Sequence, residues 1–169
     1  MIAKATNEDI PQIVELLNSA YRGESSKKGW TTEADLIAGE RRTDFANVKQ
    51  VMDQQGSIIL KYTNEEGNII GTVNLQQHDR GVYLGMFAVS PNLQGGGIGK
   101  QLLKAADEHA KTVGSKKIYM SVISVRKELI DWYKRHGYAE TGERKPFVED
   151  DLTGKHLQKL EFLILEKNI

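Results

Sequence analysis

The spacing of hydrophobic residues changes several times along the chain, and each spacing predicts a different kind of element. The first residues, Ile2 to Ala5, alternate between apolar and polar and predict a short strand. From Ile10 to Leu17 the apolar residues recur at helical spacing, and Thr6 stands where a helix cap is expected. The chain therefore begins with a strand followed by an amphipathic helix.

The next stretch is mostly polar. Tyr21 to Thr31 (YRGESSKKGWT) contains two glycines and predicts an exposed loop. Thr31 or Thr32 is a suitable cap for a second helix over Glu33 to Arg41, and Asp44 to Gln54 is a third helical stretch.

A β-rich region follows, in which apolar residues recur at every second position. Ser57 to Thr63 (SIILKYT) and Ile69 to Leu75 (IIGTVNL) flank the turn NEEGN, which predicts a hairpin. Gly81 to Val89 (GVYLGMFAV) is a third strand that ends at Ser90 and Pro91. Together the three strands predict an antiparallel meander.

The second half alternates between the two kinds of element. Helices are predicted from Gly97 to Thr112 and from Glu128 to His136, with a strand over Lys117 to Val122 between them. Tyr138 begins another extended run, and Leu160 to Leu165 is the final strand. Residues 146–156 are polar and predict a solvent-facing loop. This order predicts an α+β or mixed α/β fold with helices on the faces of a sheet.

Composition narrows the class of protein. A chain of 169 residues fits one domain over residues 1–169, and 23 basic side chains balance 23 acidic ones. Without a global basic field, we expect neither nucleic acid nor a membrane surface as partner. There is no Cys, and the four His residues lie far apart, so no disulfide, reactive thiol or metal site is predicted. No apolar run reaches the length of a membrane span, and we expect a cytoplasmic protein.

The densest chemical signal is a glycine cluster between a strand and a helix, SPNLQGGGIGK over residues 90–100. Glycines let backbone N–H groups approach a ligand, and the first turn of a helix offers unpaired N–H donors and a favourable dipole. The cluster therefore favours a phosphate or pyrophosphate ligand. A turn that merely caps the helix is the alternative, although interior glycines cost a helix about 1 kcal/mol each.

The spacing of the cluster distinguishes among phosphate ligands. Gln94 and Gln101 stand where a P-loop requires Gly and Ser or Thr, and the dinucleotide fingerprint G-x-G-x-x-G fails as well. What matches is Q-x-x-G-x-G over residues 94–99, directly after a strand that ends in FAVSP. Here the sequence resembles the GNAT superfamily of N-acetyltransferases.

That resemblance implies a GNAT-like acyl-CoA N-acyltransferase fold, a central, mostly antiparallel sheet flanked by helices, with acetyl-CoA as cosubstrate and no metal. It further implies that the strand before the loop contacts the pantetheine and acetyl groups, and that the loop amides hold the pyrophosphate. The residues that take these positions are Phe87, Ala88 and Val89 on the strand and Gln94, Gly95, Gly96, Gly97, Ile98, Gly99 and Lys100 in the loop.

A second motif, ELIDWYKRHGY over residues 128–138, looks like the family's helix that carries a general acid. Tyr133 takes the position of that acid, and a core aromatic residue is the alternative reading. Where the family often has an Asn that contacts pantetheine, this chain has Arg126, which is left to reach a phosphate or solvent. Gly85 and Met86 stand where many members carry an acidic base, so the motif assigns no base.

If the family mechanism holds, the acceptor is a primary amine of a small molecule or peptide, which attacks the thioester directly. Tyr21, Arg22 and Trp30 are candidates for its pocket, and Arg22, Arg41 and Arg42 either meet a carboxylate or phosphate of the acceptor or form a solvated basic face. The nominal bases are His78, Glu33 and Glu40.

Two other classes of function stay open at this point, a non-catalytic acyl-CoA sensor and a nucleotide-binding domain or kinase. A homodimer is expected only because homodimers are common.

Overall fold

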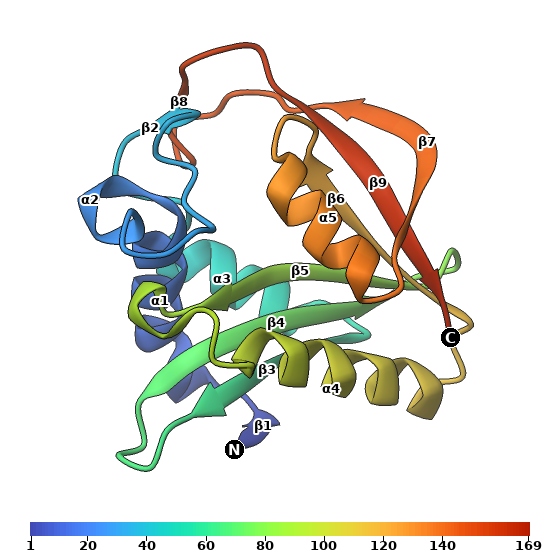
Figure 1. Cartoon of the computed structure of the whole chain (residues 1–169). Helices are drawn as coiled ribbons and strands as arrows, with labels where there is room; N and C mark the ends of the chain where they lie inside the picture. Colours follow the sequence, from blue (N-terminus) through green and yellow to red (C-terminus); the bar gives the residue numbers. More distant parts are fainter.

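The computed structural model describes residues 1–169 and is built on a seven-stranded sheet in the order β1-β3-β4-β5-β6-β9-β7 (Figure 1). All neighbouring strands are antiparallel except β5 and β6, which are parallel. The strands of this sheet are β1 (Ile2–Lys4), β3 (Ser57–Thr63), β4 (Ile69–Gln77), β5 (Val82–Val89), β6 (Lys117–Ile123), β9 (Glu161–Asn168) and β7 (Ala139–Pro146). A small second sheet pairs β2 (Ile37–Ala38) with β8 (Lys155–His156).

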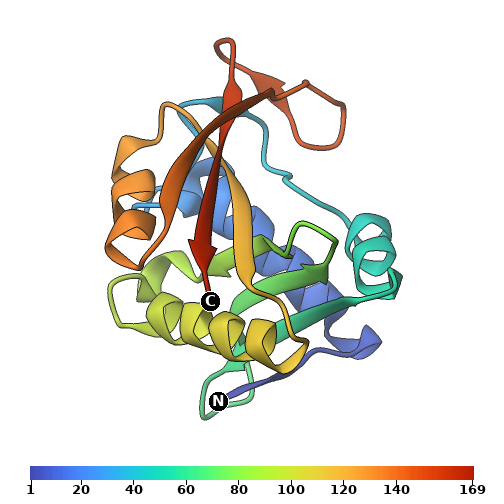
Figure 2. The same ribbon diagram turned by 90° about the vertical axis from the view of Figure 1, so that its right-hand side faces the viewer.

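The helices form two layers, one on each face of the sheet. They are α1 (Ile10–Tyr21), α2 (Gly23–Ser26), α3 (Phe45–Asp53), α4 (Ile98–Thr112) and α5 (Lys127–Arg135), and two short 3-10 turns span Asn7–Asp9 and Pro91–Leu93. α4 and α5 cover one face and enclose a core of 19 buried residues, whereas α1 and α3 cover the other with a core of 11 (Figures 1 and 2).

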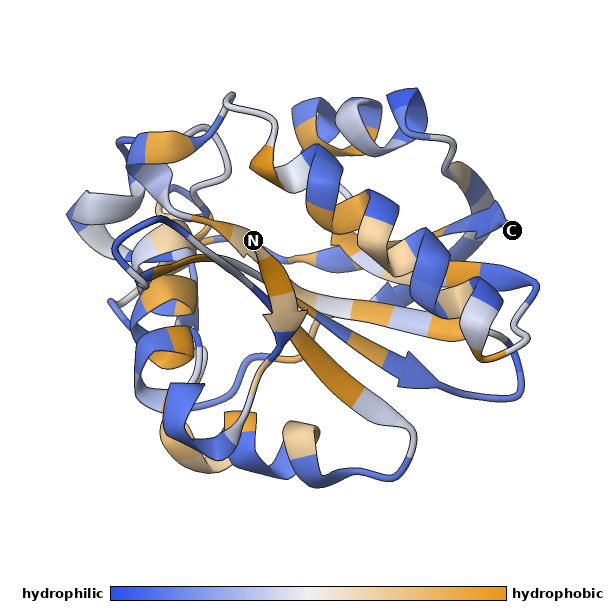
Figure 3. Cartoon of the chain, turned by 90° about the horizontal axis from the view of Figure 1, so that it is seen from below, coloured by the Kyte–Doolittle hydropathy of each residue, from blue (hydrophilic) through white to orange (hydrophobic).

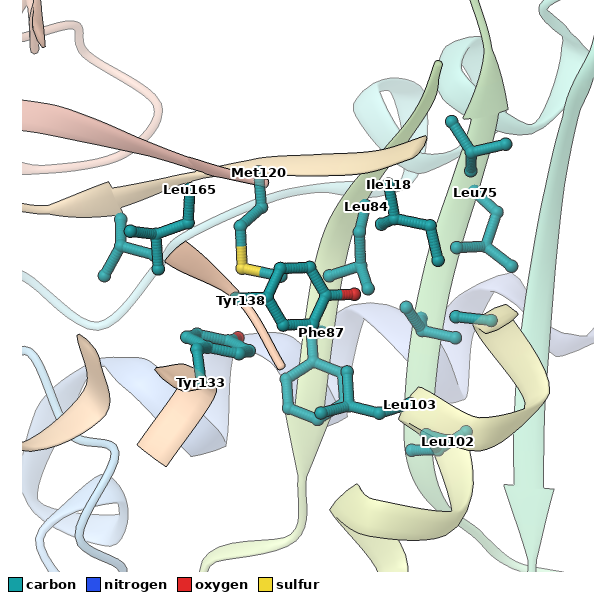
Figure 4. Close-up of a cluster of buried hydrophobic side chains, with 14 of the residues drawn as sticks. Leu75, Leu84, Phe87, Leu102, Leu103, Ile118, Met120, Tyr133, Tyr138 and Leu165 are labelled. Atoms are coloured by element: carbon teal, nitrogen blue, oxygen red, sulfur yellow. The ribbon is translucent and has the colours of Figure 1, made fainter. Parts of the chain in front are cut away.

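The longer helices are amphipathic, with their buried apolar residues on one side. In α4 the fully buried positions include Leu102, Ala106 and Ala110, which follow one another at four-residue steps. Hydrophobic and hydrophilic bands therefore alternate along the helices in Figure 3. α4 ends at Thr112, and Gly114 just beyond its end has a φ of 76°, the left-handed conformation that glycine adopts most readily. Figure 4 shows the core that α4 and α5 share, in which Phe87 of β5 lies between Leu103 of α4 and Tyr133 of α5.

The feature that positions the site is the separation of β5 from β6. The two strands pair only where Val82 meets Ile118 and Tyr83 meets Tyr119. Beyond these pairs β5 continues to Val89 and β6 to Ile123 without a shared ladder, and the strands diverge (Figure 1). Unpaired backbone groups along this edge are free to bind a ligand, and carboxyl ends of parallel strands are where such folds place ligands.

The structure confirms most of the predicted elements within a few residues. These are the antiparallel meander, the helices around residues 10–17, 97–112 and 128–136, and the strands at 117–122 and 160–165. The third helix, predicted over Asp44 to Gln54, is confirmed as α3. The extended run after Tyr138 is β7, and residues 146–156 are largely exposed but contain β8. No helix combines the length and the apolar character that crossing a bilayer requires.

The predicted helix over Glu33 to Arg41 is wrong. The backbone makes a single turn, in which Glu33 O accepts from both Leu36 N and Ile37 N, and then enters β2. Ile37 is fully buried against Ile123 and Leu160, and Gly39 has a φ of 106° that no helix contains. Tertiary packing therefore overrides the local helical preference.

The predicted exposed loop over Tyr21 to Thr31 is also wrong in its first half. Tyr21 ends α1 and is buried, Arg22 is 2% exposed, and Ser26 of α2 is fully buried. The polar side chains of Arg22 and Ser26 are bound inside the protein, whereas Glu24, Ser25, Lys27 and Lys28 are exposed as predicted.

Candidate active site

The predicted phosphate-binding loop lies at the N-terminus of α4, directly after β5. Gly95 and Gly97 have φ of 91° and 86°, and Gly97 is the residue before the first turn of α4. No protein acceptor takes the N–H groups of residues 95–100, because no side chain caps this helix. A Cβ at Gly95 or Gly97 would enter open space. The loop is therefore a cradle of free N–H donors, with open space beside Gly95 and Gly97.

A groove of about 440 Å³ extends from this cradle between β5 and α5. Nine of the ten strand and loop residues singled out in the sequence line it, and Gly96 is the one that does not. α5 supplies the opposite wall with Leu129, Trp132 and Arg135. Helix α4 comes close to this wall at Gly99, where a Cβ would lie 3.3 Å from Trp132 and 3.4 Å from Phe87. The sequence therefore identified one side of the groove, and missed the side contributed by α5.

The Gln94 side chain holds the groove's outer rim together. Its Nε2 donates to Thr31 Oγ1 at 2.7 Å and to Val89 O at 3.0 Å, while its Oε1 accepts from Trp30 N at 2.8 Å. Gly29 leaves the space that this amide occupies, since a Cβ there would overlap Gln94. Trp30 consequently lies in the groove, 6.1 Å from Trp132 between ring centroids, and not in the second cleft described below.

A β-bulge interrupts the pairing of β5 with β4 beside the groove. Thr72 pairs with Ala88 and Asn74 with Gly85, so two residues of β5 oppose one residue of β4. Met86, one of the two, has a φ of 45°, the only positive value at a residue other than glycine. The Tyr21 hydroxyl donates to the carbonyl oxygen of the other, Phe87. Tyr21 therefore fixes the bulge, which turns backbone groups of β5 away from the ladder.

A second cleft, of about 370 Å³, opens on the other side of the bulge. Residues of β5, β6, α3 and the segment before α3 line it, with Arg22, Glu33, Arg42 and Arg126 as its charged members. Three residues line both the cleft and the groove, and they are Tyr21, Phe87 and Leu129. The two depressions therefore meet at the bulge of β5.

Tyr133 lies in the wall of the second cleft close to this junction. Its ring is 6.1 Å from that of Phe87 between centroids, and the two are labelled together in Figure 4. The Tyr133 hydroxyl has no hydrogen-bond partner in the protein, but it is not completely buried. The Tyr138 hydroxyl, in contrast, is both completely buried and without a partner. Burial, and then the neighbouring Tyr21, raise the pKa of Tyr133 well above that of free tyrosine. Tyr133 therefore presents a phenol that keeps its proton.

Glu33 joins two arginines beside the junction. Its Oε1 accepts from Arg22, and its Oε2 accepts from Arg126 Nη1 at 3.1 Å. Arg22 also donates through Nε to Thr153 O at 3.0 Å, and Arg126 donates to Thr31 O. Burial lowers the pKa of Arg22 and Glu33 opposes that shift, so the pair holds its charges together.

The structure shows where Arg126 and the three candidate bases lie relative to the two depressions. Arg126 lines the second cleft and is bonded to Glu33, so it does not lie along the groove wall where a phosphate contact was considered. Of the nominal bases, Glu33 lines the cleft but both of its oxygens already accept from arginine. His78 and Glu40 are exposed and line neither depression. No group of three or more His, Asp or Glu side chains is placed to hold a metal ion.

Removal of the Glu33 carboxylate is expected to destabilise the protein by about 3 kcal/mol or more, because Arg22 would remain buried without a counter-charge. Urea unfolding of Glu33→Ala, followed by circular dichroism, measures the loss. Glu143→Ala is the matched control, since its partner Arg80 and Glu143 itself are both substantially exposed. Equal unfolding midpoints for the two variants would show that the buried network does not stabilise this face.

Comparison with known proteins agrees with this geometry. Residues 10–138 match the acetyltransferase (GNAT) family, and the chain therefore belongs to that family. No curated protein matches the sequence as a relative.

Many solved structures share the fold at low identity. A ribosomal-protein-alanine N-acetyltransferase from Brucella melitensis is 21% identical with a TM-score of 0.74, and the match covers 100% of this chain and 99% of that one. An IAA acetyltransferase from Bacillus cereus is 18% identical with a TM-score of 0.68, at 100% and 99% coverage. A spermidine N-acetyltransferase chimera from Vibrio cholerae and hSSAT is 15% identical with a TM-score of 0.69, at 99% and 95%.

Proposed function

We propose that this acetyltransferase transfers the acetyl group of acetyl-CoA directly to a primary amine of a small molecule or peptide. The observation that carries the proposal is the meeting of groove and cleft at Tyr21, Phe87 and Leu129. Two substrates that bind at the same time in the two depressions have their ends at one place. Such placement makes a direct transfer effectively intramolecular, without an acyl-enzyme.

The groove fits coenzyme A in the chemistry of its donors. The free N–H groups of residues 95–100, at the positive end of α4, fit a pyrophosphate, and Lys100 and Arg135 add positive charge along the groove. The unpaired edge of β5 fits an arm that contains amide groups. Members of the family use acetyl-CoA as cosubstrate, and when bound it supplies the acetyl group as an activated thioester.

The residues at the junction serve the transfer in two ways. Backbone N–H groups released by the bulge of β5 stabilise negative charge that develops on the acetyl oxygen. Tyr133, whose burial keeps it protonated, donates its proton to the departing sulfur. Since Glu33 is committed to two arginines, no free carboxylate lines the cleft, and the proton of the acceptor passes to solvent at the mouth of the cleft.

The fold does not indicate which amine is the acceptor. The three structural neighbours are named for a ribosomal-protein alanine, for IAA and for spermidine, and these compounds differ in size and in charge. The acceptor class must therefore come from the side chains of the second cleft.

Thiol release from acetyl-CoA, measured with a colorimetric reagent across amino acids, amino amides, polyamines, aminoglycosides and peptides, tests the proposal. We expect at least one amine to stimulate release well above the rate with water alone. If acetyl-CoA binds to the protein but no amine stimulates release, the proposal fails in favour of an acyl-CoA sensor.

A further inference from the structure

The second cleft carries a surplus of positive charge. Its charged lining residues are three arginines, Arg22, Arg42 and Arg126, and a single carboxylate, Glu33. The formal sum of these four side chains is two positive charges in a partly enclosed space. The acidic residues of the loop at 149–151 are exposed and do not line the cleft.

Two of the three arginines are already bound. Arg22 and Arg126 share the two oxygens of Glu33 and use further donors on backbone carbonyl oxygens. Their role is to order the chain around the junction, and the single carboxylate between them leaves the third arginine uncompensated.

Arg42 is that uncompensated cation. Only its backbone N–H is hydrogen-bonded within the protein; the guanidinium has no hydrogen bond or ion pair there, and its Cζ lies 4.6 Å from the centroid of the Tyr21 ring. Stacking on an aromatic face orients a guanidinium while leaving its N–H edge free for an oxyanion. Arg42 is half-buried and lines the cleft, so its guanidinium is within reach of a ligand bound there.

The backbone that carries Arg42 is fixed from α1. Asn18 Oδ1 accepts from Arg42 N at 2.6 Å and from Thr43 N at 2.9 Å, and Asn18 Nδ2 donates to Thr43 O at 3.2 Å. Tyr21, on which the guanidinium stacks, belongs to the same helix and also holds the bulge of β5. Helix α1 therefore holds Arg42 in a fixed position relative to the bulge of β5, where the groove and the cleft meet.

We propose that the acceptor is a small amine that also carries a compact oxyanion, a carboxylate or phosphonate, and that Arg42 binds this group. The inference rests on the proposed function, since it names the acceptor of that same reaction. The two formal charges attract such an acceptor and repel a polycation. A positive field also lowers the pKa of an ammonium group, which favours the neutral amine that attacks.

Matched acceptors test the inference. Thiol release is measured with the twenty protein amino acids, their amides, aminomethylphosphonate and spermidine, in the wild type, Arg42→Ala, Arg42→Lys and Arg41→Ala. We expect kcat/KM for the best amino acid to exceed that for its amide at least about tenfold, the loss expected when a charged partner is removed. Arg42→Ala should abolish this preference and Arg42→Lys restore part of it. Arg41, exposed and outside the cleft, is the control and should preserve the preference.

Calorimetric binding of the same amines, with CoA present, separates this inference from the proposed function. If amino acids bind in an Arg42-dependent manner without turnover, the anion site stands and the proposed transfer fails. If amides or spermidine are acetylated as well as amino acids, or if Arg42→Ala changes both classes equally, the anion site is overturned while the transfer stands. Failure of every anionic amine both to bind and to react would also overturn it.

Discussion

Gly97→Glu is expected to weaken acetyl-CoA binding by at least about a hundredfold, which corresponds to about 2.7 kcal/mol. Gly97 has a φ of 86° and faces open space at the start of α4, among N–H groups that have no protein acceptor. A glutamate side chain here fills the cradle and places its own carboxylate on those donors, so a pyrophosphate is excluded by volume and by charge. Titration calorimetry with acetyl-CoA measures the change.

Gly114→Glu is the matched control for this prediction. Gly114 also has a left-handed φ, 76°, and open space around its Cα, but it lies at the other end of α4. Both substitutions carry the cost of a left-handed residue, about 1 kcal/mol or more, and both add one negative charge. If Gly114→Glu weakened acetyl-CoA binding as much as Gly97→Glu, the effect would come from destabilisation, and the loop would not be the binding site.

Tyr133→Phe is expected to lower kcat by about a hundredfold or more, the usual contribution of a general acid, with little change in the KM for acetyl-CoA. The ring stays in the core that it shares with Phe87 and Tyr138, so the fold is retained and only the hydroxyl is lost. Tyr138→Phe removes the hydroxyl of an equally buried tyrosine, and that hydroxyl has no hydrogen-bond partner and does not line the cleft. It should leave kcat unchanged, and a similar loss in both variants would contradict the role of Tyr133.

The pH profile gives an independent check of the same residue. Because burial raises the pKa of Tyr133 well above its ordinary value of about 10, the phenol stays protonated at every pH below that value. We therefore expect kcat to show no fall from loss of this proton between about pH 7 and pH 9. A descending limb in that range that disappears in Tyr133→Phe would show that the hydroxyl titrates far lower than the structure implies.

The glycine loop with its free N–H groups was predictable because everything that forms it is local. The glycines, the end of β5 and the first turn of α4 are contiguous in the sequence, so composition and spacing are sufficient to predict an anion site. The general-acid role that we propose for Tyr133 rests on the resemblance to the family, because a core aromatic at helical spacing gives the same sequence pattern.

The second cleft was not predictable in the same way. Glu33, Arg126 and Thr153 come from distant parts of the chain, and no local signal indicates that they surround Arg22. The same contacts explain the wrong helix over Glu33 to Arg41, where the Glu33 carboxylate and the buried Ile37 are held by partners far away in sequence. Arg42 and Arg41 are indistinguishable as sequence, and only packing against Tyr21 separates the one in the cleft from the one in solvent.

The central claim is that an acetyl group passes from the groove to an amine in the second cleft. Mass spectrometry of the amine and of the protein, after incubation with acetyl-CoA, tests it most directly. We predict an acetylated amine, formed in proportion to the CoA released, and an unmodified protein. An unmodified amine in the presence of bound acetyl-CoA, or an acetyl group attached to the protein and transferred from there, would contradict the account.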